Sequence, residues 1–115
     1  MKKLIVLALL MLSALTLLGA DVTGTWSVAV VLDAGSGAAT FTFKQTGETL
    51  TGTYTGTFGQ SQVTGTVKGD QVEWSFDNDQ VGKVTYQGTV DGAGKMKGTV
   101  TYGQLGKGSF AGEKK

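Results

Sequence analysis

From Gly24 to the end of the chain, apolar and polar side chains alternate residue by residue in short segments. Brief turns rich in glycine, aspartate and asparagine separate these segments, and a period of two with such turns indicates strands that have one buried and one wet face. The pattern predicts strands at residues 24–32, 38–45, 49–57, 61–68, 71–77, 83–90, 95–102 and 107–113. Because no turn exceeds about five residues, consecutive strands should pair as antiparallel hairpins.

The two faces of these strands differ sharply in composition. Threonine, lysine and glutamine fill one phase, and the other phase is apolar and holds nearly all the aromatic side chains of the chain: Trp26, Phe41, Phe43, Tyr54, Trp74, Phe76, Tyr86, Tyr102 and Phe110. Closing a meander of short strands removes the exposed edges of the sheet. The sequence therefore predicts an all-β fold, an antiparallel up-and-down meander of about eight short strands closed into a small barrel.

Two other all-β arrangements compete with this interpretation. An open two-sheet sandwich would bury the same apolar phase, whereas an outer-membrane barrel would turn it toward lipid. Membrane-spanning strands need about 9–11 residues, and the segments here are nearer seven or eight. The closed barrel with an apolar interior is the favoured fold.

Glycine recurs on the apolar phase at Gly52, Gly65, Gly88 and Gly98. In a small barrel such positions give room to aromatic neighbours and allow the strands to bend. Replacing one of them with valine should overfill the interior, at a cost of about 1–3 kcal/mol.

Residues 1–20 have the layout of a secretory signal peptide. Lys2 and Lys3 precede an apolar run that ends in the small pair Gly19-Ala20. We predict cleavage after Ala20, which leaves residues 21–115 as a single exported domain, periplasmic or extracellular; an uncleaved membrane anchor is the alternative. The chain contains no cysteine, so no disulfide can stabilise the exported domain.

Composition narrows the chemistry. The chain has no cysteine, histidine or arginine, so it lacks the best metal ligands and the usual nucleophile–base pairs. Residues 21–115 carry 8 lysines against 9 acidic residues, so they lack the excess of positive charge that is typical of proteins that bind nucleic acid. The carboxylates fall mainly in turns, where nothing raises a pKa for acid–base work. We predict a protein without catalysis, cofactor or metal, and without a membrane partner once the leader is removed.

One turn resembles the start of a calcium loop. Residues 77–82 place oxygen ligands at the first and third positions and glycine at the sixth, but the fifth position is Val81 and the twelfth is Gly88. An acidic hairpin turn explains the segment better.

The inward tyrosines are the candidate functional residues. A buried tyrosine hydroxyl needs a hydrogen-bond partner, so several of them inside one small barrel suggest a cup with a partly polar lining. We predict Tyr54, Trp74 and Tyr86 as ligand-binding residues for a small, partly apolar molecule in the barrel mouth. A surface-acting inhibitor or accessory domain for an exported protein is the alternative, as is a structural envelope protein, and the oligomeric state is left open.

Two short motifs add a family resemblance. Thr23-Gly24-Thr25-Trp26 resembles the G-x-W opening of the calycin barrels, such as the lipocalins, and Leu50-Thr51-Gly52-Thr53-Tyr54 is similar to the third strand of avidins. The resemblance implies a ligand site at the open end of the barrel, Trp26 with Gly24 closing the other end, and Tyr54 as a polar contact inside. Calycins pair the tryptophan with a basic residue of the last strand, for which Lys107 and Lys114 are the candidates.

A second resemblance covers most of residues 21–115. Segments rich in glycine and threonine are similar to those of small secreted bacterial β-domains that occur alone or appended to exported hydrolases. These segments are Gly24–Trp26, Leu50–Thr53, Val63–Gly69 and Lys107–Ala111.

Overall fold

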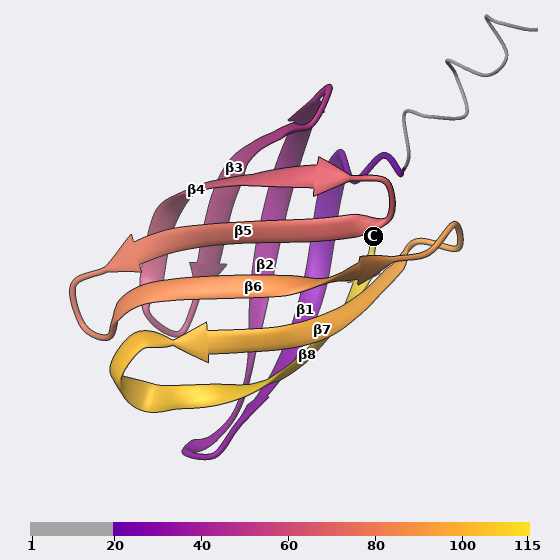
Figure 1. Ribbon diagram of the computed structural model, residues 1–115. Coiled ribbons are helices and arrows are strands. Elements are labelled where there is room, and N and C mark those ends of the chain that lie inside the picture. Colours follow the sequence, from indigo (N-terminus) through magenta and orange to yellow (C-terminus); the bar gives the residue numbers. More distant parts are fainter. Residues whose placement is uncertain (1–19) are drawn as a thin grey trace, which may run out of the picture.

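The computed structural model describes residues 20–115, so the signal peptide predicted for the first residues lies almost entirely outside the described part. The strands are β1 (Gly24–Leu32), β2 (Gly35–Thr46), β3 (Thr49–Gly56), β4 (Gly59–Lys68), β5 (Gln71–Asn78), β6 (Gly82–Val90), β7 (Lys95–Tyr102) and β8 (Gly106–Lys114). A short 3-10 turn, η1 (Gly103–Leu105), joins the last two. Each strand pairs antiparallel with the next, and β8 pairs with β1 (Figure 1). The predicted closed up-and-down barrel is confirmed, and the open sandwich is excluded.

The strand register places the apolar phase inside the barrel. Trp26 pairs with Phe41 and Phe41 with Tyr54, so these side chains lie side by side across β1, β2 and β3. On the opposite wall Trp74 pairs with Tyr86 across β5 and β6. All five rings are buried. The interior is therefore filled mainly by aromatic side chains, as the alternation predicts.

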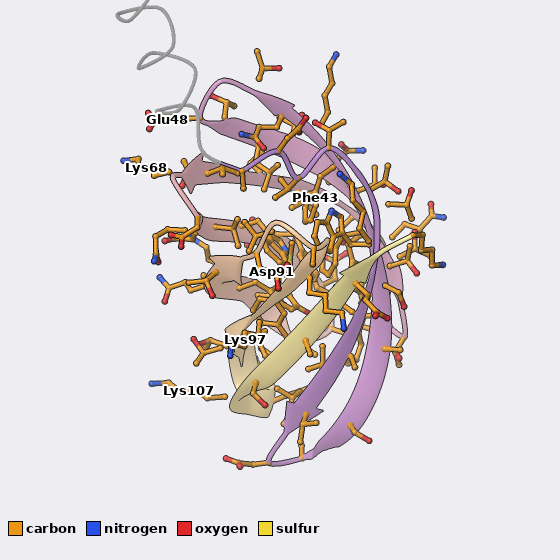
Figure 2. The ribbon with its side chains drawn as sticks, turned by 90° about the vertical axis from the view of Figure 1, so that its right-hand side faces the viewer. Phe43, Glu48, Lys68, Asp91, Lys97 and Lys107 are labelled. Carbon is orange, nitrogen blue, oxygen red and sulfur yellow. The ribbon has the colours of Figure 1, made fainter. Side chains whose placement is uncertain are left out.

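The outer face of the barrel is polar. Figure 2 shows Phe43 inside the barrel and Lys68, Lys97 and Lys107 pointing away from its wall. Among residues 20–115, Val31 is the one large apolar side chain that is exposed. The alternative that turns the apolar phase toward lipid is therefore wrong for this barrel. In the same part of the chain, no helix is long and apolar enough to cross a membrane.

The sequence predicts that a larger residue at an inward glycine would overfill the barrel interior, but the structure shows that it would collide with the backbone of the next strand. A Cβ atom at Gly65 would fall on the carbonyl oxygen of Glu73, and one at Gly98 on that of Gln87. Both oxygens belong to the backbone of a neighbouring strand. A larger residue is therefore excluded mainly because the two strands lie so close together, and the space taken up by the aromatic side chains matters less.

One end of the barrel is closed by the segment that precedes β1. Val22 is fully buried, and its carbonyl oxygen accepts a hydrogen bond from Trp26 Nε1 at 2.9 Å. The Gln45 side chain holds the segment in place, because its Oε1 accepts from the Val22 N–H at 2.9 Å and its Nε2 donates to the Ala20 carbonyl at 3.0 Å. The Ala20 N–H donates to the Gly69 carbonyl at 3.0 Å. These contacts leave the opposite end as the mouth of the barrel.

Candidate ligand site at the open end of the barrel

The mouth of the barrel contains a cavity of about 170 Å³. The β1–β2, β3–β4 and β7–β8 connections surround it. Its lining is apolar apart from hydroxyl groups: Val30, Leu32, Ala34, Gly35, Ser36, Gly37, Ala38, Tyr54, Thr57, Phe58, Tyr102 and Leu105. Phe58 and Leu105 are partly exposed at the rim, whereas Tyr54 and Tyr102 are buried and form its inner side.

Three tyrosine hydroxyls meet beneath this cavity. The hydroxyls of Tyr86 and Tyr102 are 2.6 Å apart and share one hydrogen bond. The Tyr54 hydroxyl accepts a hydrogen bond from the Phe58 N–H at 3.4 Å. Burial raises the pKa of Tyr102 to about 12 and raises that of Tyr86 above its ordinary value. The neighbouring phenols add to the shift of Tyr86, whereas the hydrogen bond with Tyr86 lowers the pKa of Tyr102 and Tyr54 raises it. Tyr86 and Tyr102 therefore stay protonated at ordinary pH.

The three residues predicted to bind a ligand occupy two depths of the barrel. Tyr54 borders the mouth cavity. Trp74 and Tyr86 are fully buried below it, with their rings stacked at a centroid distance of 4.9 Å. Tyr86 reaches the cavity only through the hydroxyl of Tyr102. The ligand-binding role of Tyr54, Trp74 and Tyr86 stays a prediction.

The interior beneath the cavity is a cluster of packed aromatic rings. Trp74 also contacts Phe41, Phe43 and Phe110 edge to face, at centroid distances of 5.2, 4.9 and 5.5 Å. Its indole N–H is buried and has no hydrogen-bond acceptor among residues 20–115. Edge-to-face packing of this kind leaves a ligand no room below the tyrosine hydroxyls.

Several residues of the mouth were not predicted as site residues. Tyr102 has the inward phase of its strand, and this phase is the signal that could have identified it. Phe58 lies in the β3–β4 turn and Leu105 in η1, where alternation gives no information. Their position at the rim follows from the closure of the barrel.

The segment that resembles a calcium loop is a hairpin turn. Asn78 Oδ1 accepts the backbone N–H groups of Gln80 and Val81 at 2.7 and 3.2 Å, and its Nδ2 donates to the Phe58 carbonyl at 3.1 Å. The side chain thus joins the β5–β6 turn to the β3–β4 turn beside the mouth. In the part of the chain that the structure describes, no group of three acidic side chains could hold a metal ion.

A larger depression, of about 820 Å³, lies on the outer wall along β7, β8 and β1. Its rim is charged, and Lys95 Nζ lies 3.7 Å from Glu113 Oε1 in an exposed ion pair. Exposed pairs of this kind contribute about 0–1 kcal/mol. No charged side chain within residues 20–115 is buried, so the described carboxylates all stand in solvent.

The closed strand order and the cup at one end define a small up-and-down β-barrel. A solved structure with a similar fold is that of a redesigned beta barrel, mFAP1, bound to DFHBI. The two chains superpose with a TM-score of 0.63 over 82% of this chain and 94% of that chain, at 21% sequence identity. At this identity the likeness establishes a shared fold. No protein-family model matches the sequence, and no curated protein is significantly similar to it.

Proposed function

We propose that the chain is an exported, non-catalytic binding module that takes one small, partly apolar molecule into the mouth of its barrel. The observation that carries this proposal is the mouth cavity itself, which has an apolar wall and nearly buried tyrosine hydroxyls at its inner side. Small-molecule sites commonly combine an apolar lining with a few placed polar groups. The mFAP1 barrel, whose structure was solved with DFHBI bound, supports the idea that a barrel of this fold can hold a small molecule.

The size of the cavity limits the ligand. A volume of about 170 Å³ is close to the roughly 150 Å³ of an engineered apolar cavity that binds benzene. Pockets for drug-sized molecules are usually about 300–1,000 Å³. The proposed ligand is therefore a single ring or a compact branched molecule, because a long acyl chain would have to displace the aromatic interior.

Two further parts of the proposal rest on the sequence. The layout of residues 1–20 supports export with cleavage after Ala20, and the absence of thiol and imidazole groups supports a role without catalysis. The exposed position of the described carboxylates agrees with that role. Export is tested by mass spectrometry of the protein recovered from the exported fraction of a bacterial host. The measured mass should match a chain that begins at Asp21. Recovery of a full-length membrane-bound form would contradict it.

The binding function is tested with one-ring probes. In a ¹H–¹⁵N NMR titration of the exported protein, toluene should shift the amide signals of Tyr54, Phe58, Tyr102 and Leu105 in a saturable manner. The variant Leu105→Trp should fill the cavity and abolish these shifts. Gln104→Trp is the matched control, because Gln104 is the exposed neighbour of Leu105 and lies outside the lining. Unchanged spectra of the wild-type protein would overturn the proposal.

A specific feature of the wall favours a second candidate, a module that acts through its outer surface on an exported protein. The β4–β5 ladder ends at Thr64 and Ser75, which leaves Gly59–Val63 of β4 unpaired on that side where β4 curves away (Figure 1). A polar depression of about 500 Å³ lies beside this opening. Unpaired strand edges are sites where another chain can add a strand.

Native mass spectrometry separates the two candidates. The mouth binder should carry a small-molecule adduct when purified from the exported fraction, or take up toluene stoichiometrically. A bare chain that binds no probe would favour the surface module, and a stable multimer of this chain would favour a structural role.

A further inference from the structure

We infer that the mouth site selects a neutral one-ring molecule that carries a carbonyl-type oxygen, held by the hydroxyl protons of Tyr54 and Tyr102. This inference rests on the proposed function, because it names the ligand class of the same site. Its basis is the count of hydroxyl protons beneath the cavity and of the acceptors that are available to them.

The hydrogen bond between Tyr86 and Tyr102 has a preferred direction. Tyr86 is fully buried, and the Tyr102 hydroxyl is its one hydrogen-bond partner among residues 20–115. If Tyr102 donated to Tyr86, the Tyr86 proton would be buried without an acceptor, and an unsatisfied buried donor costs about 1–3 kcal/mol. Tyr86 therefore donates to Tyr102. The proton of Tyr102, which borders the cavity, is left for a molecule inside it.

Tyr54 supplies a second free proton. Its oxygen accepts the Phe58 N–H, but its own O–H has no acceptor within the described residues. Tyr54 is 1% and Tyr102 4% exposed, and both side chains border the cavity. Tyr54 lies close enough to raise the pKa of Tyr102, and without a ligand the Tyr102 proton can point toward the Tyr54 oxygen. A bound carbonyl oxygen competes with that oxygen for the proton. A carbonyl oxygen has two lone pairs, so one such oxygen can accept both protons.

The surroundings favour a neutral ligand. No charged side chain lines the cavity, so no cation would balance a carboxylate there. Placing an unpaired anion in an apolar site is costly. Aldehydes, ketones and amides satisfy the two donors without bringing a charge. The volume of about 170 Å³ restricts them to molecules with one ring.

Three probes of similar size test this selection: ethylbenzene, acetophenone and benzoate. They share one ring and differ in carrying no acceptor, a neutral carbonyl and a charged carboxylate. We expect acetophenone to bind and benzoate to bind at least about tenfold more weakly. Tyr102→Phe and Tyr54→Phe each remove one hydroxyl, so each should weaken acetophenone binding by about tenfold and change ethylbenzene binding less than about twofold.

Tyr86→Phe is the control for the direction of the hydrogen bond. It removes the donor to Tyr102 but leaves the Tyr102 proton free for the ligand, so it should weaken acetophenone binding less than Tyr102→Phe does. A stronger effect of Tyr86→Phe would overturn the assigned direction and with it the role of Tyr102.

The carbonyl stretch of acetophenone, ¹³C-labelled at the carbonyl, provides a readout that does not depend on affinity. Two hydrogen bonds should lower its frequency on binding to the wild-type protein, and each single Tyr→Phe change should reverse part of that shift. If circular dichroism shows that a variant does not fold, the frequency shift in the wild-type protein still tests whether the bound carbonyl accepts hydrogen bonds. A bound carbonyl with the frequency seen in hydrocarbon solvent would disprove the inference.

Failure of this inference is distinguishable from failure of the proposed function. If ethylbenzene and acetophenone both bind and the tyrosine variants affect them equally, the mouth is a binding site without the inferred selectivity. Tighter binding of benzoate than of acetophenone would likewise refute the neutral class alone. If neither ethylbenzene nor acetophenone binds, the proposed function itself is wrong.

Discussion

Lys114 Nζ lies 6.0 Å from the centroid of the Trp26 ring, and the two residues are register partners across β8 and β1. The resemblance to calycins left Lys107 and Lys114 as candidates for this contact. Lys107 instead pairs with Thr101 near the mouth, so the structure assigns the contact to Lys114. With Val22 accepting the indole N–H, Trp26 is held by a hydrogen bond and covered by a cation at the closed end.

The two partners should contribute very differently to stability. Trp26 is fully buried, so Trp26→Ala should lower the free energy of unfolding by about 3–5 kcal/mol. Lys114 is exposed, and Lys114→Ala should lower it by about 0.5–1 kcal/mol, the range of an exposed cation–π contact. Urea unfolding followed by far-UV circular dichroism measures both, with Lys115→Ala as the control. A Lys114→Ala effect as large as that of Trp26→Ala would show that this account of the closed end is wrong.

A methyl group added at Gly65 should be far more harmful than one added to an unobstructed glycine. In Gly65→Ala the new Cβ meets the Glu73 carbonyl, so β4 and β5 must move apart, at a cost of about 1–3 kcal/mol. Gly37 has open space around the corresponding position, and Gly37→Ala should be neutral or stabilise the barrel by up to about 1 kcal/mol. Equal unfolding midpoints for the two variants would contradict the close approach of the strands.

Much of this fold follows from local pattern. Alternation identifies the inward side chains, and the shortness of the turns dictates the antiparallel order. The sequence predicts that β2 starts at residue 38, because Gly35-Ser36-Gly37 has the composition of a turn, but the strand begins at Gly35. In the structure Ser36 and Gly37 continue the ladder with Val31 and Val30, which shortens the β1–β2 turn. Pairing with a neighbouring strand here overrides local composition.

The depth of a residue along the barrel is harder to predict than its phase. Tyr54, Trp74 and Tyr86 share the inward phase, yet only Tyr54 borders the cavity. Strands tilt relative to the barrel axis, so inward residues on different strands lie at different heights. The fully buried Val22 precedes the first strand, and its hydrogen bonds with Gln45 and with the Trp26 indole explain its position. Alternation carries no information on either point.

Gln45 should be essential for closing the end opposite the mouth. Gln45→Leu would leave the Val22 N–H without its acceptor, which costs about 1–3 kcal/mol, and would free the segment before β1 in the protein that begins at Asp21. Amide hydrogen exchange at Val22 and at the Trp26 indole N–H should accelerate. Gln87→Leu is the matched control, because Gln87 makes one exposed hydrogen bond to Glu73. Similar exchange rates in the two variants would show that Gln45 does not hold the segment.

The buried tyrosines should make the barrel sensitive to alkali. In the unfolded chain Tyr102 loses its proton near its ordinary pKa of 10.0, whereas in the barrel burial raises that pKa to about 12. Above pH 10 the unfolded state therefore binds fewer protons than the folded state, so the free energy of unfolding falls as the pH rises from 10 to about 12. The pKa of Tyr86 is raised by the same cause, which steepens the decline.

Urea midpoints measured across this range, together with tyrosinate absorbance, test the alkaline effect. The wild-type midpoint should fall between pH 10 and about 12, and that of Tyr102→Phe should fall less, because one of the two shifted groups is gone. Tyrosinate absorbance of the folded protein should show Tyr102 titrating near pH 12. A midpoint that is flat over this range, or a Tyr102→Phe variant that declines as steeply as the wild-type protein, would mean that water reaches these hydroxyls freely. The proposed selection of a neutral carbonyl ligand would then lose its physical basis, because it depends on the burial of the tyrosine hydroxyls beneath the mouth cavity.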